Sequence, residues 1–197
     1  MARLCTYLVR EDTGLAPNPF CGWCTLAVCT PNHQGARVNP RDWIAGFLTK
    51  ARGHRFLYAM EVAEALDLDA YFHDPRFQSK KPDLRGNWTQ RCGDNFYSRD
   101  SAGQWTQHRN RFHLTRALKV QDTQHPRSFV AERFWYLGRS AVSSPSEFAP
   151  LIGARGIRIN HDPTLVDRFR NWVSATFQPG VADVPNDNSD MVEYPVT

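Results

Sequence analysis

The sequence predicts an α+β domain that contains a small mixed β-barrel, peripheral short helices and one C-terminal helix. Short apolar runs rich in strand-forming residues follow one another through most of the chain. Only one segment has a strong helical pattern, and the regular alternation of strands and helices that a doubly wound sheet needs is absent. The 197 residues fit a single domain, which we place at residues 1–178.

Five segments carry the strand prediction, and each is apolar and bounded by turn-forming residues. Leu4–Val9 and Cys24–Cys29 flank a turn that is rich in glycine, proline and asparagine. Trp43–Leu48 and Arg55–Val62 are joined by a polar loop, as in a hairpin. Arg127–Gly138 is another strand region, in which three aromatic residues are adjacent.

Two helices are predicted from their N-terminal capping residues. Asp67 is placed to cap a short helix over Leu68–Phe72, which ends before an Asp-Pro pair. Asp162 caps the longer C-terminal helix, and Pro163 occupies its first position. A further helical turn is expected at Ser146–Ile152. The C-terminal helix has an apolar face with helical spacing, formed by Leu165, Phe169, Trp172 and Val173.

The net charge of +4 is distributed unevenly. Residues 179–197 contain four acidic residues and no Lys or Arg, and we expect them to form a flexible acidic tail. The rest of the chain has 24 basic and 16 acidic residues, a net charge of +8 that suits either an anionic partner such as nucleic acid or solubility alone. No apolar run is long enough to span a membrane and no signal peptide is recognisable, so we expect a cytoplasmic protein.

The stretch Asp74–Tyr97 is the part around which we expect the rest of the chain to be organised. It has no long helical or strand periodicity and is predicted to be mostly loop. A polar loop of this length inside a compact domain is usually either functional or disordered. Its aromatic and aliphatic residues argue against disorder, so a functional loop is the preferred interpretation.

This stretch and the Pro-Asn-Pro turn before it supply the candidate ligands. Basic side chains can neutralise phosphates, and we assign that role to Arg76, Lys80, Lys81 and Arg85. Aromatic rings stack on bases, and polar side chains hydrogen-bond an exposed base edge. We assign base contacts to Asn18, Phe20, Trp23, Trp88, Asp94, Asn95 and Tyr97. The structural alternative stays open for each of them: a Gly-Asp-Asn turn bonded to its own backbone, and aromatic residues that anchor the loop.

The five cysteines, an odd number, indicate reduced thiols rather than a disulfide framework. Cys21 and Cys24 form a C-x-x-C pair that opens a strand and not a helix, which argues against a thioredoxin-like redox site. Cys29 and His33 offer a second pair of zinc ligands, but thiols that pack as small hydrophobic groups are the preferred interpretation. No histidine spacing typical of metal sites, no P-loop and no nucleophile motif is found, so we expect no metal and no cofactor.

Five long segments within roughly residues 1–138 have a recognisable pattern: TYLVREDTGLAPNPFCGWCTLAVCTP, VNPRDWIAGF, LYAMEV, YFHDPRFQSKKPDLRG and GDNFY. Together they resemble the nucleotide-modification-associated domain family, second type. That family occurs in bacterial and phage settings linked with modified DNA bases. The resemblance therefore implies a role connected with modified bases, but it carries over no set of catalytic residues.

Five shorter pieces form a second pattern: Tyr7-Leu8-Val9, Arg41-Asp42-Trp43, Met60-Glu61-Val62, Asp74-Pro75 and Lys81-Pro82. They resemble EVE and other PUA-like domains. Arg41 departs from the pattern of these domains, because glycine is expected at that position. The resemblance implies that the predicted barrel is PUA-like, and it implies contact with nucleic acid and a pocket for a modified base.

Three functional hypotheses follow. The first is a module that binds a modified nucleobase, in DNA or as a nucleotide, in a setting of DNA modification or phage defence. The second is an enzyme that acts on a nucleotide or modified base as a hydrolase, glycosylase or transferase, with Asp94 as its acid or base and Cys24 or His73 as lesser candidates. The third is an accessory protein whose basic face meets an acidic protein partner.

Overall fold

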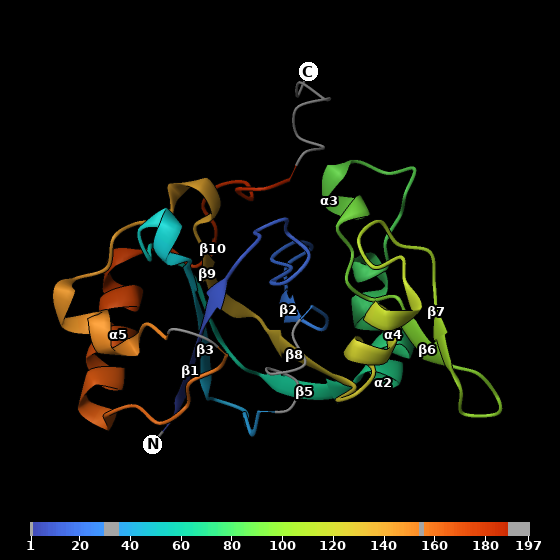
Figure 1. The fold of residues 1–197 in the computed structure, drawn as a ribbon, viewed down its shortest axis with the longest axis horizontal. Helices are drawn as coiled ribbons and strands as arrows, with labels where there is room; N and C mark the ends of the chain where they lie inside the picture. The colour runs from blue at the N-terminus through green and yellow to red at the C-terminus, as the bar shows by residue number, and fades with distance from the viewer. Residues whose placement is uncertain (1, 30–35, 154–155, 189–197) are drawn as a thin grey trace.

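The computed structural model describes residues 2–29, 36–153 and 156–188, which form ten strands in three sheets and a few short helices (Figure 1). The strands are β1 (Leu4–Val9), β2 (Cys24–Leu26), β3 (Trp43–Leu48), β4 (Phe56–Glu61), β5 (Glu64–Asp67), β6 (Tyr97–Arg99), β7 (Trp105–Gln107), β8 (Arg127–Ala131), β9 (Arg133–Tyr136) and β10 (Gly180–Val181). The α-helices are α2 (Leu68–His73), α3 (Trp88–Arg91), α4 (Arg116–Asp122) and α5 (Pro163–Thr176). The 3₁₀ helices are η1 (Lys50–Arg52), η2 (Pro75–Lys80), η3 (Gly138–Ser140) and η4 (Ser146–Leu151).

The largest sheet is mixed, with the strand order β1-β3-β4-β9-β10. β1 runs parallel to β3, with Leu4 opposite Trp43 and Val9 opposite Leu48. β3 and β4 form an antiparallel hairpin, and β9 continues the sheet antiparallel to β4. Every residue of β3 is buried, which explains why its sequence is an unbroken apolar run rather than an alternating one.

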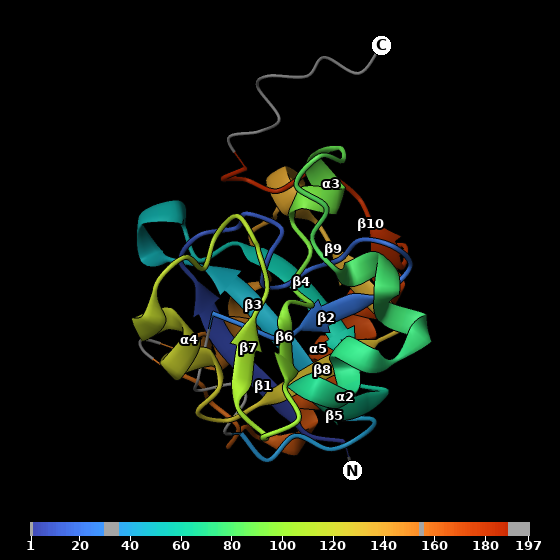
Figure 2. The same ribbon diagram turned by 90° about the vertical axis from the view of Figure 1, so that its right-hand side faces the viewer.

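Three hydrophobic cores separate the layers of the molecule. One lies between the five-stranded sheet and α5, and Phe47, Trp135 and Phe169 belong to it. A second lies between that sheet and the three-stranded sheet β2-β8-β5, and Ile44 and Phe129 belong to it. The third lies between the three-stranded sheet and a lobe that contains α2, α4 and the β6–β7 hairpin (Figures 1 and 2). α5 and this lobe therefore lie on opposite sides of the sheets.

The prediction of a mixed α+β fold is confirmed, and several elements match closely. The strands at Leu4–Val9 and Trp43–Leu48 have the predicted bounds. Asp67 and Asp162 cap their helices, each accepting a backbone N–H on its side chain. The strand predicted over Cys24–Cys29 ends earlier, at Leu26. A closed barrel is not found within the described residues, so the PUA-like architecture is not confirmed.

The acidic C-terminal segment is packed against the body between residues 180 and 188, in contrast to the predicted flexible tail. β10 pairs with β9, and the Asp187 carboxylate accepts two hydrogen bonds from Arg52, at 2.5 and 2.7 Å. The side-chain amide of Asn188 donates to the Thr13 carbonyl at 3.0 Å. The remainder of the predicted tail, residues 189–197, lies outside the described residues.

Candidate functional site

The stretch Asp74–Tyr97 is ordered by short capped helices rather than being mostly loop. Asp74 caps η2, and Asn87 caps α3 in a reciprocal capping box. Gly93 then crosses the backbone of Lys80 at close range: a Cβ atom at residue 93 would lie 2.4 Å from the Lys80 carbonyl oxygen. Only glycine fits at this crossing, which brings the Gly-Asp-Asn sequence against the interior.

Lys80 is the centre of a buried hydrogen-bond network that joins two distant parts of the chain. Its side chain is 1% exposed. Its ammonium group donates to the carbonyl oxygens of Asn18 and Trp23 at 2.9 and 2.7 Å, and to the side-chain oxygen of Asn18 at 2.8 Å. Burial lowers the pKa of Lys80 to about 8, and the nearby charge of Asp94 opposes this shift. Three acceptors match the three N–H groups of a protonated amine, so Lys80 fastens the Pro-Asn-Pro turn to the loop.

Asp94 and Asn95 belong to the same buried network. The Asp94 carboxylate accepts from the Thr25 hydroxyl at 2.6 Å and from the Tyr71 hydroxyl at 2.8 Å. The Asn95 amide donates to the carbonyl oxygens of Tyr71 and Phe77 at 3.0 and 3.1 Å. Burial raises the pKa of Asp94, and the charge of Lys80 and the two hydroxyl donors partly oppose the shift. These contacts give both residues a structural role inside the fold.

The structure therefore corrects the sequence assignment for several candidate ligands. Four of the residues assigned to base contacts are at most 1% exposed, and the side chain of each makes at least one hydrogen bond within the protein; these are Asn18, Asp94, Asn95 and Tyr97. Lys80 is equally buried and cannot reach a phosphate from this position. Arg76 is exposed, but its guanidinium group is paired with Asp74 and Glu64, each at 2.6 Å. In sequence, a buried lysine and a phosphate-binding lysine look alike.

The remaining candidates lie at the edge of this network. Trp23 and Trp88 are half-buried, Lys81 is half-buried and Arg85 is exposed. We call these four residues the loop rim. Phe20 is buried under the rim, with its ring edge-to-face against Trp88 at 5.2 Å between centroids. The rim keeps two indole rings and two cations in contact with solvent, which are the groups that nucleotide binding requires.

Lys81 also belongs to a cluster of basic groups around the ring of Phe72. The Lys81 ammonium lies 3.7 Å from the ring centroid, and the imidazole of His108 stacks on the ring at 4.5 Å with an interplanar angle of 12°. His73 adds a second imidazole, edge-to-face at 5.2 Å. The His108 ring nitrogen Nε2 is 2.8 Å from the Ser98 hydroxyl. Burial lowers the pKa of His108, and the positive charges of Lys81 and His73 lower it further.

A second constellation surrounds the thiol of Cys29. The Cys29 sulfur lies 3.0 Å from Nε2 of His113. The other ring nitrogen of His113, Nδ1, makes a short contact with Oδ2 of Asp122. The same oxygen accepts from the Tyr97 hydroxyl at 2.8 Å, while Oδ1 of Asp122 accepts from the backbone N–H of Cys29 at 3.1 Å. We call these four residues the Cys29 cluster.

The elements that meet at this cluster hold its members firmly. Asp122 is the last residue of α4, and Tyr97 begins β6. The backbone N–H and carbonyl of His113 are both bonded to the side chain of Asn110, at 2.6 and 2.9 Å. Burial by the surrounding protein raises the pKa of the Cys29 thiol, and the charge of Asp122 raises it further. The residue itself is exposed at the surface, and its backbone has a left-handed φ of 74°.

Sequence reasoning did not find the Cys29 cluster. Cys29 was considered only as a zinc ligand with His33, and His113 was treated as an ordinary histidine. The available signal was a Thr115 capping residue before a short helix that ends in Asp122, which would have brought His113 and Asp122 together. Cys29 is 84 residues away from His113 in sequence, and only the packing of β2 against β8 and α4 connects them.

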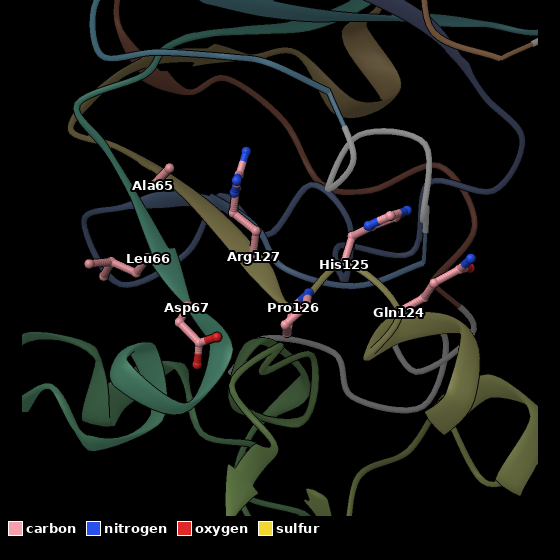
Figure 3. A pocket seen from close by; sticks show the side chains of 7 residues that line it. All are labelled: Ala65, Leu66, Asp67, Gln124, His125, Pro126 and Arg127. Carbon is pink, nitrogen blue, oxygen red and sulfur yellow. The ribbon is translucent and has the colours of Figure 1, made fainter.

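A hollow of about 440 Å³ opens beside the end of α4 (Figure 3). One wall is the segment that follows Asp122, and the other wall is β5. Its polar side chains spread around the opening and do not converge on one point, as Figure 3 shows. None of the residues that were assigned to base or phosphate contacts lines it. The lining residues are Ala65, Leu66, Asp67, Gln124, His125, Pro126 and Arg127.

The possible zinc site has no support in the described part of the chain. Cys24 is completely buried in β2, whereas Cys21 is exposed. His33 lies outside the described residues. Across residues 2–29, 36–153 and 156–188, no group of three or more histidine, cysteine, aspartate or glutamate side chains is arranged to hold a metal ion.

Comparison with known proteins assigns the family. A sequence model described as nucleotide modification associated domain 2 matches residues 1–192, nearly the whole chain. The chain belongs to the nucleotide modification associated domain 2 family. No curated protein and no solved structure matches it.

Membership of the nucleotide modification associated domain 2 family puts the chain in the context of nucleotide modification. The family match extends well past residue 138, where the resemblance seen in the sequence ended, so it includes α5 and the packed acidic segment. It does not confirm the resemblance to PUA-like domains. Among the described helices, none combines the length and the apolar composition needed to cross a bilayer.

Proposed function

We propose that this chain binds a nucleotide, or a nucleotide unit of a nucleic acid, that carries a modified base. The family supports the nucleotide part of the proposal. The observation that carries it is the position of the Lys81 ammonium, 3.7 Å from the centroid of the Phe72 ring that stacks on His108. This arrangement holds one cation of the loop rim at the surface beside an imidazole.

A phosphate group is the anion that suits these residues. Lys81, His73 and His108 bring positive or titratable groups around one ring, and the pKa of His108 is lowered by burial and then by repulsion from the other two. A bound phosphate would remove that repulsion and favour protonated His108. Asp69 is the acidic group in this neighbourhood and lies 3.5 Å from His73, so Lys81 and His108 are the better phosphate ligands.

The base would stack on the loop rim. Trp23 and Trp88 are the half-buried indoles on the rim. The ammonium group of Lys80 holds the backbone carbonyl of Trp23, and Lys80 directly precedes Lys81 in the sequence. Proteins bind single nucleotides and unpaired bases on aromatic rings next to a cation. When these rings are already rigid, binding loses little conformational entropy in the loop.

The salt dependence of binding tests the phosphate contacts. In the double variant Lys81→Ala, Arg85→Ala, the slope of log K against log salt concentration should become shallower by about 1.5, because each lost phosphate contact removes about 0.7–0.9. Arg168→Ala is the matched control, since Arg168 is also exposed but lies on α5 on the opposite side of the sheets. Fluorescence titrations of an oligonucleotide at several salt concentrations give the slope. An unchanged slope in the double variant overturns this assignment.

A second candidate function is an enzyme that acts on the bound nucleotide. The contact between Cys29 and His113 favours it, because a thiol beside an imidazole that is itself held by a carboxylate is the arrangement of a nucleophile with its general base. Asp94, the acid or base expected from the sequence, is less suited to this role because it is buried and bonded to two hydroxyl groups.

A further inference from the structure

We propose that Cys29 is the nucleophile of an acyl-transfer site, in which His113 is the general base and Asp122 orients the imidazole. Three contacts carry the proposal: sulfur to Nε2 at 3.0 Å, Nδ1 to the carboxylate, and the carboxylate to the backbone N–H of Cys29 at 3.1 Å. Cys29 is an exposed residue, whereas His113 and Asp122 are buried, so Cys29 is the member of the cluster nearest to solvent. The surrounding protein still covers its thiol enough to raise the thiol pKa.

The hydrogen bonds fix which nitrogen of His113 is free to accept a proton. Asp122 is a carboxylate acceptor, so Nδ1 of His113 carries the hydrogen that faces it. Nε2 then has a lone pair directed at the Cys29 thiol, which donates its S–H to it. This is the tautomer in which an imidazole removes a proton from a nucleophile. The opposite tautomer would place its single N–H, on Nε2, against the Cys29 sulfur, and would set the lone pair of Nδ1 against the Asp122 carboxylate.

Asp122 couples the base to the nucleophile. One carboxylate oxygen holds the His113 ring and the Tyr97 hydroxyl, and the other holds the backbone of Cys29. Cys29 takes a left-handed backbone conformation, with φ of 74°, that non-glycine residues rarely adopt. The carboxylate therefore fixes the position of the thiol relative to the imidazole from both sides, and Tyr97 acts as a positioning residue.

The chemistry that uses all three groups is transfer of an acyl group. As the Cys29 sulfur attacks a carbonyl carbon, the S–H proton passes to Nε2 of His113 and the carbonyl π electrons move to its oxygen. When the intermediate collapses, the bond from carbon to the leaving nitrogen or oxygen breaks, and His113 returns the proton to that leaving atom. The product is a thioester on Cys29. Water then attacks the thioester, His113 takes a proton from the water, the C–S bond breaks, and the sulfur recovers its proton, which yields a carboxylic acid.

The substrate class follows from this chemistry together with the nucleotide function proposed above, on which this step of the inference rests. A base modified with an amide- or ester-linked acyl group is the substrate that fits both. The leaving group is then the amine or hydroxyl of the nucleobase, which needs the proton that His113 delivers. The purely structural alternative is that the thiol only packs against His113.

Acylation by p-nitrophenyl acetate tests the site without any nucleotide. The full-length protein would be treated near pH 7, and the acetylation rate of each cysteine would be followed by peptide mass spectrometry. Cys21 is the internal reference, because it is an exposed cysteine outside the cluster. Since the surroundings raise the pKa of Cys29, an unassisted Cys29 should react more slowly than an ordinary exposed thiol. We expect Cys29 instead to be acetylated about 10²-fold faster than Cys21, which is the lower end of the acceleration that a general base provides.

Two variants complete the test. His113→Gln should remove the rate advantage of Cys29, while Cys21→Ser should leave the rate at Cys29 unchanged. The comparison of Cys29 with Cys21 is made in the wild-type protein and needs no variant to fold. The proposal is overturned if Cys29 reacts no faster than Cys21, or if His113→Gln keeps the advantage in a folded protein. Because the probe carries no nucleotide, these outcomes are independent of nucleotide binding.

Discussion

Replacing Lys80 by methionine is expected to lower the free energy of unfolding by about 3–5 kcal/mol, the usual cost of removing one partner from a buried charged network. Methionine fills similar space but donates no hydrogen bond. Three oxygens of Asn18 and Trp23 would then each lose one donor inside the protein. Asp94 would also lose the positive charge that opposes the rise of its pKa. Urea denaturation followed by tryptophan fluorescence and circular dichroism measures the change.

The matched control is Lys81→Met, the same substitution one residue later. Lys81 lies at the surface over Phe72, and its loss should cost less than about 1 kcal/mol. In contrast, Lys81→Ala should weaken nucleotide binding, whereas a folded Lys80 variant should not change its salt dependence. Equal losses of stability in the two methionine variants would contradict the structural role of Lys80.

The pH dependence gives the same assignment a second test. The pKa of Lys80 is about 8 in the folded protein and 10.5 when unperturbed. Between these two values the unfolded chain binds more protons at this residue than the folded protein does, so this residue makes stability rise with pH. Below about pH 8 Lys80 is protonated in both the folded and the unfolded state, so the full cost of burying its charged amine is present. We therefore expect the stability difference between wild type and Lys80→Met to grow from about pH 8 to about pH 10.5.

The second large effect is expected from Asp122→Asn, which should slow acetylation of Cys29 by about 10²–10⁴-fold. The carboxylate accepts hydrogen bonds on both oxygens from His113, Tyr97 and the backbone of Cys29. An amide has only one oxygen and presents N–H groups on its other side. Either the Cys29 backbone or the imidazole then loses its acceptor, and the imidazole can turn its N–H toward the thiol.

Tyr97→Phe is the control for the loss of Asp122. It removes one donor to the carboxylate but leaves His113 and the backbone of Cys29 in contact with it. We expect a reduction of less than about tenfold in the rate, in line with one lost hydrogen bond. Thermal unfolding of each variant must begin only above the assay temperature. A folded Asp122→Asn protein that reacts at the wild-type rate would show that Asp122 does not orient the base.

The sequence predicted those parts of the fold that depend on local chemistry. An uninterrupted apolar run identified β3, and an acidic capping residue followed by a helical pattern identified α2 and α5. α4 and the β6–β7 hairpin were missed, because a short helix with exposed Val120 and Leu114 beside it has no apolar periodicity to reveal it. The packed acidic segment was also missed, since its polar residues are held by partners such as Arg52 and Thr13 that are distant in sequence.

The candidate site could be predicted only in part, for a related reason. The residue types in the stretch Asp74–Tyr97 suggested ligands, but their burial is decided by the close crossing of Gly93 over Lys80, which sequence does not reveal. Lys80 and Lys81 are adjacent and chemically identical, yet one is inside the protein and the other on the rim. The Cys29 cluster depends on three segments that meet only in the folded protein.

Binding of matched oligonucleotides and free nucleotides, with plain and modified bases, tests the proposed function most directly. Each affinity should be measured at two salt concentrations, because phosphate contacts weaken with salt while stacking and hydrogen bonding to a base do not weaken in the same way. We predict that one modified base is preferred over its plain counterpart at both salt concentrations. Equal binding of all bases that falls with salt, or no binding at either concentration, would contradict a site for a modified base.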